Sequence, residues 1–316
     1  MIRTIRLFAA AAALILPFLP AMAGKYIDVS HDINGHNRTG VLYLPDNIKE
    51  NAPLVVVVHG YGGKANPKDF DIDPVADKNG FAVLYPQGLK DPSGKTGFYV
   101  GYPSQKGMNI DDVDEICKFT SFIQKEYGLS KRNTFMTGMS NGGDLCYLAA
   151  LSGQKTFAAL ASVAGLTFTW MTEIDKTPVA VPFLEIHGTE DRVSEWGGDL
   201  KNAGGWGAYI SVPLAVNYWV AMNRCKEVVS DTIPSKDPAS KRYVVRHFFK
   251  GGKNGNEVWL YKVVGAPHCW HNGDINTGEE IWKFFSKYIK PWPAPPKPHT
   301  RFPEILLPYK ENRNGF

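Results

Sequence analysis

The first side chain that could do covalent chemistry is Ser140, in the sequence GMSNG at residues 138–142. It lies between a predicted strand at residues 134–137 and a predicted helix at residues 142–151. A sharp strand-to-helix turn strains the backbone of its central residue, and glycines on both sides remove side chains that would clash. The pattern predicts Ser140 as a nucleophile beside the N–H groups of a helix N-terminus. A helix-capping serine is the alternative interpretation.

A serine hydroxyl needs a base to activate it and a third group to orient that base. The segment HGTED at residues 187–191 follows another predicted strand, and it offers Asp191 as the acid, with Glu190 as a local alternative. Later in the chain, His268 follows the last predicted core strand and is the expected base, while His271 competes from a position further along. The order serine, acid, histidine is the one that nucleophile-elbow hydrolases use.

A glycine-rich loop, HGYGG at residues 59–63, comes directly after the predicted strand at residues 54–58. Its glycines would let backbone N–H groups approach a substrate oxygen. The N–H of Tyr61, or next that of Gly62, is expected to pair with the N–H of Asn141 in an oxyanion hole. A phosphate-binding loop is the alternative, but the Lys-Ser or Lys-Thr pair that such loops require does not follow.

The remaining histidines near these motifs are not expected to react. His59 and His187 each precede a glycine, and we interpret them as structural, hydrogen-bonded residues. A metal site made of His268, Cys269 and His271 is disfavoured, because further ligands do not occur at a recognisable spacing. The sequence therefore predicts neither a metal nor a cofactor.

The elements that must position these residues alternate between strands and helices. The β-branched run at residues 54–58 is typical of a strand buried on both faces, whereas residues 111–127 carry apolar side chains at helical spacing. Repeated units of this kind predict a mostly parallel sheet covered on both faces, with its chemistry at the carboxyl edge. Strands are expected at residues 40–44, 54–58, 81–85, 134–137, 157–163, 182–186, 244–249 and 258–264, and helices at 111–127, 142–151, 213–222 and 279–289.

Composition and the two ends of the chain limit the class to which this protein belongs. The chain has 316 residues, 44% hydrophobic and 21% charged, with a net charge of +4, which gives no electrostatic signature of nucleic-acid or membrane binding. Residues 1–23 combine basic residues, an apolar stretch and a small-residue cleavage site, so we predict a signal peptide cut after Ala23 and a periplasmic or extracellular protein. Residues 24–290 form the expected catalytic domain, and residues 291–316 a proline-rich extension.

An oxidising compartment would permit disulfides among the four cysteines. Cys117 and Cys146 are expected at similar depth on neighbouring helices, whereas Cys225 and Cys269 are expected at opposite edges of the sheet. Free thiols remain the favoured interpretation for all four, because cysteine is often simply a small core residue.

Together these motifs resemble the poly(3-hydroxybutyrate) depolymerase / feruloyl esterase family, which overlaps carbohydrate esterase family one. The resemblance implies an α/β-hydrolase fold with a mostly parallel eight-stranded sheet in a three-layer sandwich, and the roles given above to Ser140, Asp191 and His268. Tyr61 and Cys269 depart from the residues that such sequences often have, Cys and Thr, so substrate choice is where this chain is expected to differ. The resemblance runs from about residue 40 to 290 and is carried by residues 59–63, 111–113, 138–143, 187–191 and 268–270.

The sequence therefore predicts a secreted serine esterase that removes feruloyl or acetyl groups from plant cell-wall polysaccharide through an acyl-enzyme. A poly(3-hydroxybutyrate) or oligomer depolymerase is the alternative, weakened by the lack of a separate surface-binding domain. A non-catalytic carbohydrate-binding relative is the alternative of another class. Among the aromatic residues expected near the mouth, Trp270 beside His268 is the one expected to touch substrate. The others are Tyr99, Tyr102, Trp170, Trp196 and Trp206.

Overall fold

The computed structural model describes residues 24–174 and 177–291. The predicted signal peptide at residues 1–23 lies outside the described residues, as do residues 292–316 of the predicted proline-rich extension. The expectations for these two segments therefore stay predictions.

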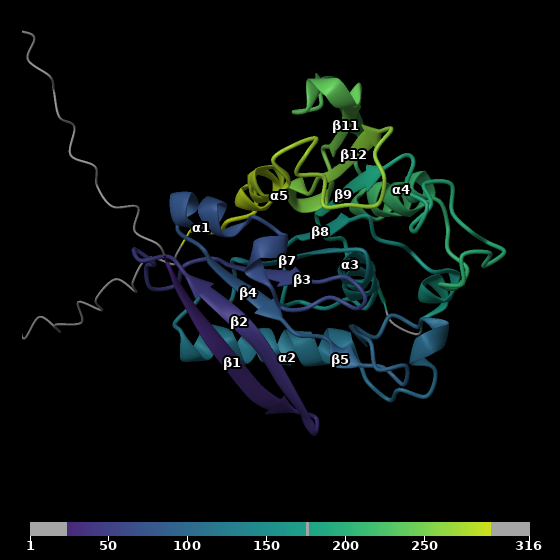
Figure 1. The fold of residues 1–316 in the computed structure, drawn as a ribbon. Helices are drawn as coiled ribbons and strands as arrows, with labels where there is room; N and C mark the ends of the chain where they lie inside the picture. The colour runs from purple at the N-terminus through teal and green to yellow at the C-terminus, as the bar shows by residue number, and fades with distance from the viewer. Residues whose placement is uncertain (1–23, 175–176, 292–316) are drawn as a thin grey trace, which may run out of the picture.

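A single large sheet runs through the molecule, with ten strands in the order β1-β2-β4-β3-β7-β8-β9-β12-β11-β10 (Figure 1). The six central strands, from β4 to β12, pair in parallel, and two antiparallel strands flank them at each edge. A second, two-stranded sheet is formed by β5 and β6. The strands are β1 (Lys25–Ile33), β2 (His36–Leu44), β3 (Leu54–Val58), β4 (Ala82–Pro86), β5 (Leu89–Lys90), β6 (Thr96–Gly97), β7 (Thr134–Met139), β8 (Leu160–Val163), β9 (Phe183–Gly188), β10 (Glu227–Pro234), β11 (Tyr243–Lys250) and β12 (Val258–Val264).

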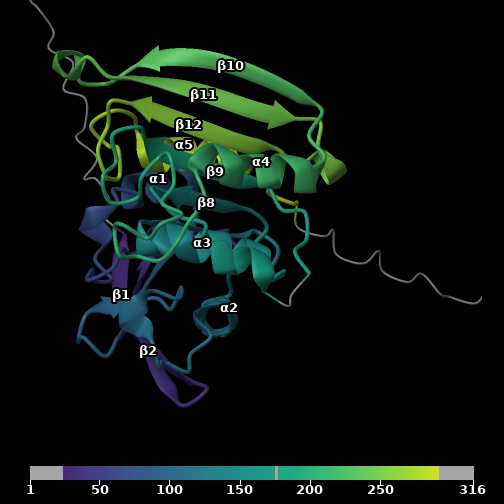
Figure 2. The ribbon, with the colours of Figure 1, turned by 90° about the vertical axis from the view of Figure 1, so that its right-hand side faces the viewer.

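Helices cover both faces of the sheet, which gives the expected three layers. The apolar residues of β3 divide between two cores by strand periodicity: Leu54, Val56 and Val58 face one, and Val55 and Val57 face the other. The first core packs under α2 (Asp112–Glu126), α3 (Asn141–Leu151) and α4 (Val212–Asn223), and the second under α1 (Asp73–Asn79) and α5 (Thr277–Ser286), as Figure 2 shows from the side. Short 3-10 turns lie at Pro67–Asp69, Pro103–Gln105, Thr169–Glu173, Pro238–Ser240 and Lys253–Gly255.

The expected α/β-hydrolase architecture is confirmed, but the expected strand number is wrong. The two additional strands are β1 and β10, which lie at the two edges of the sheet. Only Val29 and Ile33 are buried in β1, and none of the residues of β10 is. An edge strand with so few buried side chains has no apolar pattern to reveal it, and its backbone pairing with β2 or β11 defines it instead.

A buried ion cluster ties the edge of the sheet to α2. Arg38 on β2 donates through Nε to Glu115 Oε2 at 2.6 Å and also contacts the Asp112 carboxylate. The same Asp112 carboxylate accepts the N–H of Tyr99, so it fixes the start of α2 to both partners.

Within the described residues, no helix is both long and apolar enough to cross a bilayer.

Candidate active site

The loops that carry the expected site residues leave the sheet at one edge. Because β3, β7, β8, β9 and β12 are neighbours and run in parallel, their carboxyl ends lie side by side. Hydrogen bonding continues into the loops: the N–H of Ser140 donates to the carbonyl of Val163 at 2.9 Å, and that of Thr189 donates to Val263 at 3.0 Å. The loops after β7 and β9 are thus held against the ends of β8 and β12.

Ser140 occupies the strained turn that its sequence predicts. Its backbone lies at φ 56° and ψ −121°, a conformation that a residue other than glycine rarely adopts. Close packing enforces it, since a Cβ on Gly142 would lie 2.2 Å from the carbonyl oxygen of Val58, and one on Gly138 would lie 2.7 Å from the Gly142 backbone. Although Ser140 precedes α3, its side chain makes no capping hydrogen bond, so the helix-cap interpretation is wrong.

Asp191 and His268 form a direct pair. Nδ1 of His268 donates to Asp191 Oδ2 at 2.7 Å, and the other carboxylate oxygen accepts the N–H groups of Val193 and Ser194 at 2.8 Å each. Burial alone would raise the pKa of Asp191, but the hydrogen bond and charge of His268 and the two backbone N–H groups outweigh it, so the pKa lies below its ordinary value. An ionised Asp191 holds the proton on Nδ1 and leaves Nε2 of His268 free to act as a base.

The two alternatives to this pair do not take part in it. Glu190 is exposed, and its backbone N–H is bonded to the carbonyl of Ala266. His271 is buried, and its Nδ1 faces Cys269 Sγ at 3.4 Å. The structure thus brings together the acid and base favoured from the sequence.

Ser140 lies at the same edge of the sheet as this pair, but the last contact of the triad is not made. Among the hydrogen bonds of residues 24–174 and 177–291, none joins Ser140 Oγ to the His268 imidazole. The His268 side chain is 18% exposed, so it borders solvent on the side away from Asp191. Catalytic hydrogen bonds are often long in ligand-free enzymes and shorten when substrate binds.

The glycine-rich loop lies against the elbow. A Cβ on Gly60 would be 3.3 Å from Ser140 Cβ, so the loop and the serine are in contact. The N–H of Gly62 is already bonded to Thr96 at 2.6 Å, whereas that of Tyr61 has no acceptor in the described part of the chain. Asn141 is the first residue of α3, where N–H groups have no acceptor within the helix. Tyr61 and Asn141 therefore offer the two donors that an oxyanion hole requires, and Gly62 does not.

His59 holds this loop in place through hydrogen bonds, as expected of a structural histidine. Its ring is buried, Nδ1 lies 2.7 Å from the carbonyl of Gly60, and Nε2 accepts the N–H of Gly88 at 3.0 Å. Because one nitrogen accepts, the ring is neutral with its proton on Nδ1. Burial lowers the pKa of His59 below its usual range, which keeps this state.

Two polar side chains of α3 support the site: the sequence predicted a role for the backbone N–H of Asn141 but none for its side chain, and none for Asp144. The Asn141 side chain accepts the N–H of Phe98 at 2.7 Å and donates to its carbonyl at 3.0 Å. Asp144 accepts the Tyr102 hydroxyl at 2.5 Å and the N–H of Leu166 at 2.6 Å, and its burial raises its pKa to about 8. The available signal was a carboxylate one turn after the nucleophile in an otherwise apolar helix.

An aromatic cluster, composed of Tyr61, Tyr102 and Trp206, stands beside the elbow. The centroids of the Tyr61 and Trp206 rings are 5.9 Å apart, and Tyr102 lies 5.5 Å from Tyr61 and 5.2 Å from Trp206. Tyr102 is buried, while Tyr61 and Trp206 are partly exposed. A Cβ on Gly97 would touch both the Tyr61 ring and the Asn141 amide, so the cluster adjoins the proposed oxyanion donors.

The expectation that Trp270 touches substrate is not supported. Its side chain is 7% exposed, and its ring packs edge-to-face on Phe70 in the core beneath α1 and α5. Although it follows His268 closely in sequence, it turns into the protein. Of the other aromatic residues expected at the mouth, Tyr99 and Trp170 line a separate apolar cavity beside α2, and Trp196 packs against His187.

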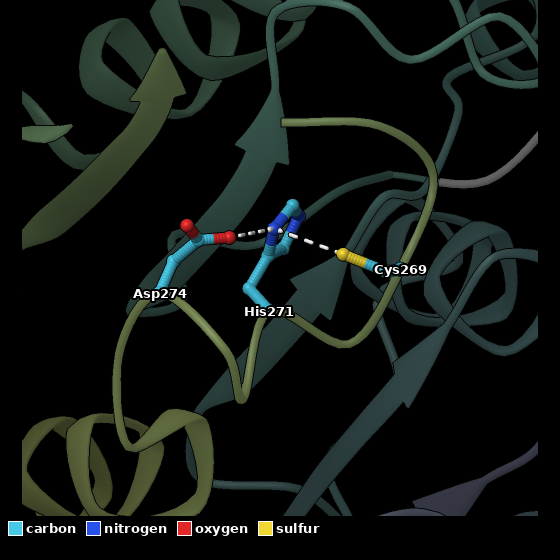
Figure 3. A group of neighbouring side chains, drawn as sticks. All are labelled: Cys269, His271 and Asp274. Atoms are coloured by element: carbon cyan, nitrogen blue, oxygen red, sulfur yellow. Dashed lines mark hydrogen bonds and ion pairs between the residues drawn. The ribbon is translucent and has the colours of Figure 1, made fainter. Parts of the chain in front are cut away.

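The residues after His268 form a compact cluster of possible metal ligands, shown in Figure 3. Within the described residues, Cys269, His271 and Asp274 place one ligand atom each within 4.8 Å of one another, so the third member is Asp274 and not His268. These donors are a poor fit to a metal. Asp274 already lies 3.3 Å from the Arg242 guanidinium, and Nε2 of His271 is buried without the acceptor that metal-bound histidines normally have. We assign no metal to the cluster.

Three of the four cysteines are plain buried or half-buried thiols. Cys146, Cys225 and Cys269 are free, and burial raises the pKa of each thiol. Raised thiol pKa values make them weak nucleophiles and poor ligands.

Comparison with known proteins relates this chain to esterases. Residues 39–218 match the family described as Esterase PHB depolymerase. A bifunctional acetylxylan esterase/xylanase of Neocallimastix patriciarum is 24% identical over 266 residues, which is 82% of this chain and 35% of that protein. Feruloyl esterase B of Thermothelomyces thermophilus is 27% identical over 177 residues, 54% of this chain and 60% of that protein. The aligned region therefore spans from about a third to three fifths of these two relatives.

Solved structures show the same fold. An acetyl xylan esterase from Aspergillus awamori aligns with a TM-score of 0.56 at 14% identity, covering 83% of this chain and 99% of the other. An S-formylglutathione hydrolase from Agrobacterium tumefaciens aligns with a TM-score of 0.55 at 13% identity, covering 85% and 97%. At such identities the likeness concerns the α/β-hydrolase fold, which matches the sheet and layers described above.

Proposed function

This chain belongs to the Esterase PHB depolymerase family, and we propose that it is a serine carboxylic-ester hydrolase of plant cell-wall polysaccharide. One observation carries the proposal: the buried hydrogen bond of 2.7 Å between Asp191 and His268, at the edge of the sheet where Ser140 occupies a strained turn. A buried carboxylate bonded to a mostly buried imidazole that still reaches solvent is the arrangement that activates a serine in such hydrolases.

The mechanism assigns one step to each group. Nε2 of His268 takes the proton from Ser140 as Oγ attacks the ester carbonyl, and the N–H groups of Tyr61 and Asn141 stabilise the oxyanion. His268 then gives its proton to the leaving alcohol, so the acyl group remains on Ser140. A water molecule, deprotonated by the same imidazole, releases the acid. Asp191 stays ionised throughout and holds the imidazole in the useful orientation.

For the acyl group we propose ferulate or acetate. The names of the two curated relatives, an acetylxylan esterase/xylanase and a feruloyl esterase, support both. The aromatic cluster supplies partly exposed ring faces at Tyr61 and Trp206, on which a phenolic ring or a sugar could stack. Trp206 thereby takes the place that the sequence suggested for Trp270.

A poly(3-hydroxybutyrate) or oligomer depolymerase is the second candidate, because the description of the matching family names that activity. Product analysis on feruloylated xylan, acetylated xylan and a hydroxybutyrate oligomer separates the candidates. Release of ferulate or acetate supports the proposal, and release of hydroxybutyrate alone contradicts the proposed substrate.

The proposed chemistry is tested by labelling the chain with a fluorophosphonate probe, which reacts only with an activated serine. The wild-type chain should be labelled, and Ser140→Ala should lose both the label and the hydrolysis of p-nitrophenyl acetate. Ser152→Ala, at the other end of α3, is the matched control and should retain both. An unlabelled wild-type chain would instead favour the non-catalytic carbohydrate-binding alternative.

We also propose that the catalytic domain, residues 24–290, is exported to the periplasm or beyond. The basic and apolar composition of residues 1–23 supports this proposal. N-terminal sequencing of the protein from its native host should give a chain that begins at Gly24, and a retained Met1 would contradict it.

A further inference from the structure

A buried pair of ionisable side chains lies beneath Asp191 and has no part in the mechanism above. Glu185 and His187 are two residues apart on β9, so they point to the same face of the sheet. Both side chains are 0% exposed, and His187 Nδ1 lies 2.8 Å from Glu185 Oε1. Burying such groups is costly unless they are paired, so the pair requires an explanation.

Both ring nitrogens of His187 face oxygen atoms. Nε2 lies 2.7 Å from the carbonyl oxygen of Ser194, which can only accept, so Nε2 carries a proton. Nδ1 faces the Glu185 carboxylate, and one proton between them resides on either the imidazole or the carboxyl group. Asp191 Oδ2 is 3.7 Å from Nε2, which favours the positively charged ring.

Charges around the ring come from four elements. Asp144 approaches from α3, Asp191 from the loop after β9, Lys262 from the register position opposite His187 on β12, and His271 from the loop after β12. Ionised Asp191 favours a protonated ring, whereas Asp144, whose pKa is raised to about 8, is uncharged below that pH. The Nζ of Lys262 lies 5.5 Å from the centroid of the Trp196 ring, and burial keeps the pKa of His271 low.

The contacts of Ser194 connect His187 to the acid. Its carbonyl accepts from His187, and its N–H donates to Asp191 Oδ1 at 2.8 Å. A displacement of the His187 ring would therefore move the turn that holds the Asp191 carboxylate, and with it the hydrogen bond to His268. The path runs from Glu185 through His187, Ser194 and Asp191 to His268, and each step is a hydrogen bond shorter than 3 Å.

We propose that His187 is a positioning residue, protonated on both nitrogens and held by Glu185, that keeps Asp191 ionised and its turn in the geometry that holds His268. The proposal rests on the esterase function proposed above. His187 touches neither substrate nor the reacting atoms, and it acts through Asp191.

The direction of the His187 pKa agrees with this assignment, whereas that of the Glu185 pKa opposes it. Burial alone would lower the pKa of His187, but the hydrogen bond and charge of Glu185, the Ser194 carbonyl and Asp191 outweigh it and raise the pKa. Burial also raises the pKa of Glu185, which favours the rival state with the shared proton on the carboxyl group. Two buried hydroxyls, Ser162 and Tyr147, face Glu185 and lower that pKa in part.

The protonation state is tested on the wild-type chain by nitrogen-15 NMR of the histidine rings at pH 8. His187 should show two protonated ring nitrogens in slow exchange with water, while His247 on β11, whose pKa is lowered by burial and Lys262, should be neutral. An unprotonated Nδ1 on His187 would place the proton on Glu185 and overturn the proposal. This measurement does not depend on activity.

The positioning role is tested with His187→Gln, which keeps a donor toward Ser194 but lacks the charge. Outer-shell partners of metal-bound histidines orient a functional imidazole in a comparable way, and their loss typically reduces activity by roughly 10- to 100-fold. We expect that loss in kcat with KM unchanged, and a shift of the acid limb of kcat/KM to higher pH, because a positive charge beside Asp191 is removed. Glu185→Gln should produce the same changes more weakly, and His247→Gln should produce none.

These outcomes also separate the two proposals. If His187→Gln keeps the kcat and pH profile of the wild type, the positioning role is wrong, whatever the reaction. If the wild-type chain neither hydrolyses esters nor reacts with a fluorophosphonate, the proposed function is wrong. Should His187→Gln fail to fold, the NMR measurement and Glu185→Gln still decide the matter.

Discussion

The two sides of the candidate site are held in place by different forces. On the elbow side, which comprises residues 138–143, the backbone packs so tightly that a Cβ on Gly142 would lie 2.2 Å from the carbonyl of Val58. On the acid–base side, which comprises Glu185, His187, Asp191 and His268, hydrogen bonds between buried polar groups fix the geometry. The elbow side relies on the absence of side chains, and the acid–base side on the presence of partners.

The buried carboxylates at these two places, Asp144 next to the elbow side and Asp191 on the acid–base side, also differ in their pKa values. Asp144, one turn after Ser140, has its pKa raised to about 8 because burial dominates. Asp191 is also buried, but its hydrogen bonds to His268 and to two backbone N–H groups lower its pKa. The number and charge of the partners, and not burial by itself, decide which carboxylate stays ionised.

The largest effect is expected from Asp191→Asn, which breaks the acid–base side. An amide in place of the carboxylate favours the wrong imidazole tautomer, and kcat should fall by about 10⁴-fold. Steady-state hydrolysis of p-nitrophenyl acetate measures it. Glu190→Gln, at the exposed neighbouring carboxylate, is the matched control and should be unchanged; equal losses in the two variants would contradict the assignment of the acid.

Two tryptophan variants test which of the two rings, Trp206 or Trp270, contacts substrate. Trp270→Ala should reduce the free energy of unfolding by about 3–5 kcal/mol, because a buried ring is removed from the core, and should leave KM unchanged at a temperature where the variant is folded. Trp206→Ala should raise KM for a feruloyl ester about 2- to 10-fold, as loss of one aromatic contact of 0.5–1.5 kcal/mol implies. Denaturant unfolding and steady-state kinetics measure the two effects, and the reverse pattern would return Trp270 to the substrate site.

Gly142→Ala tests the steric account of the elbow side. The added Cβ must displace the Val58 carbonyl, so we expect a loss of about 3 kcal/mol in the free energy of unfolding, at the upper end of overpacking costs. Gly197→Ala is the control, since a Cβ there meets no atom within 4 Å. Similar unfolding midpoints for the two variants would show that the close contact does not matter.

The pH dependence of stability should differ in sign between the two carboxylates. Because the folded-state pKa of Asp144, about 8, exceeds its unfolded value, its contribution is fully present below about pH 4 and is lost as the pH rises toward 8. Wild-type Tm should therefore fall relative to Asp144→Asn between pH 5 and pH 8, by at least about 2–4 °C.

Asp191 provides the opposite case. Its folded-state pKa is lowered, so its contribution is present above its unfolded pKa of about 4 and is lost as the pH falls below that value. The Tm difference between wild type and Asp191→Asn should shrink only in acid. If the Tm of Asp144→Asn and that of Asp191→Asn, each relative to wild type, changed with pH in the same direction, the proposed contrast between the two carboxylates would be wrong.

Much of the site could be predicted because its residues follow strands at one edge of a parallel sheet. Ser140, Asp191 and His268 were located by motif and strand end, and the structure joins the last two. Trp270 was misjudged because sequence proximity to His268 says nothing about the direction of a side chain after a turn. The edge strand β10 was missed because its side chains are exposed and leave no apolar pattern.

By itself, the sequence determined the features that arise from neighbouring residues: the strained elbow between glycines, the alternation of strands and helices, and the order of nucleophile, acid and base. Such features depend on local sterics and periodicity, which a few consecutive residues specify. Only the tertiary structure decided that His268, and not His271, binds Asp191, that Gly62 is already bonded, and that Glu185 and His187 are buried beneath the acid. Those contacts join residues from separate strands and loops, so their energies exist only after the chain has folded.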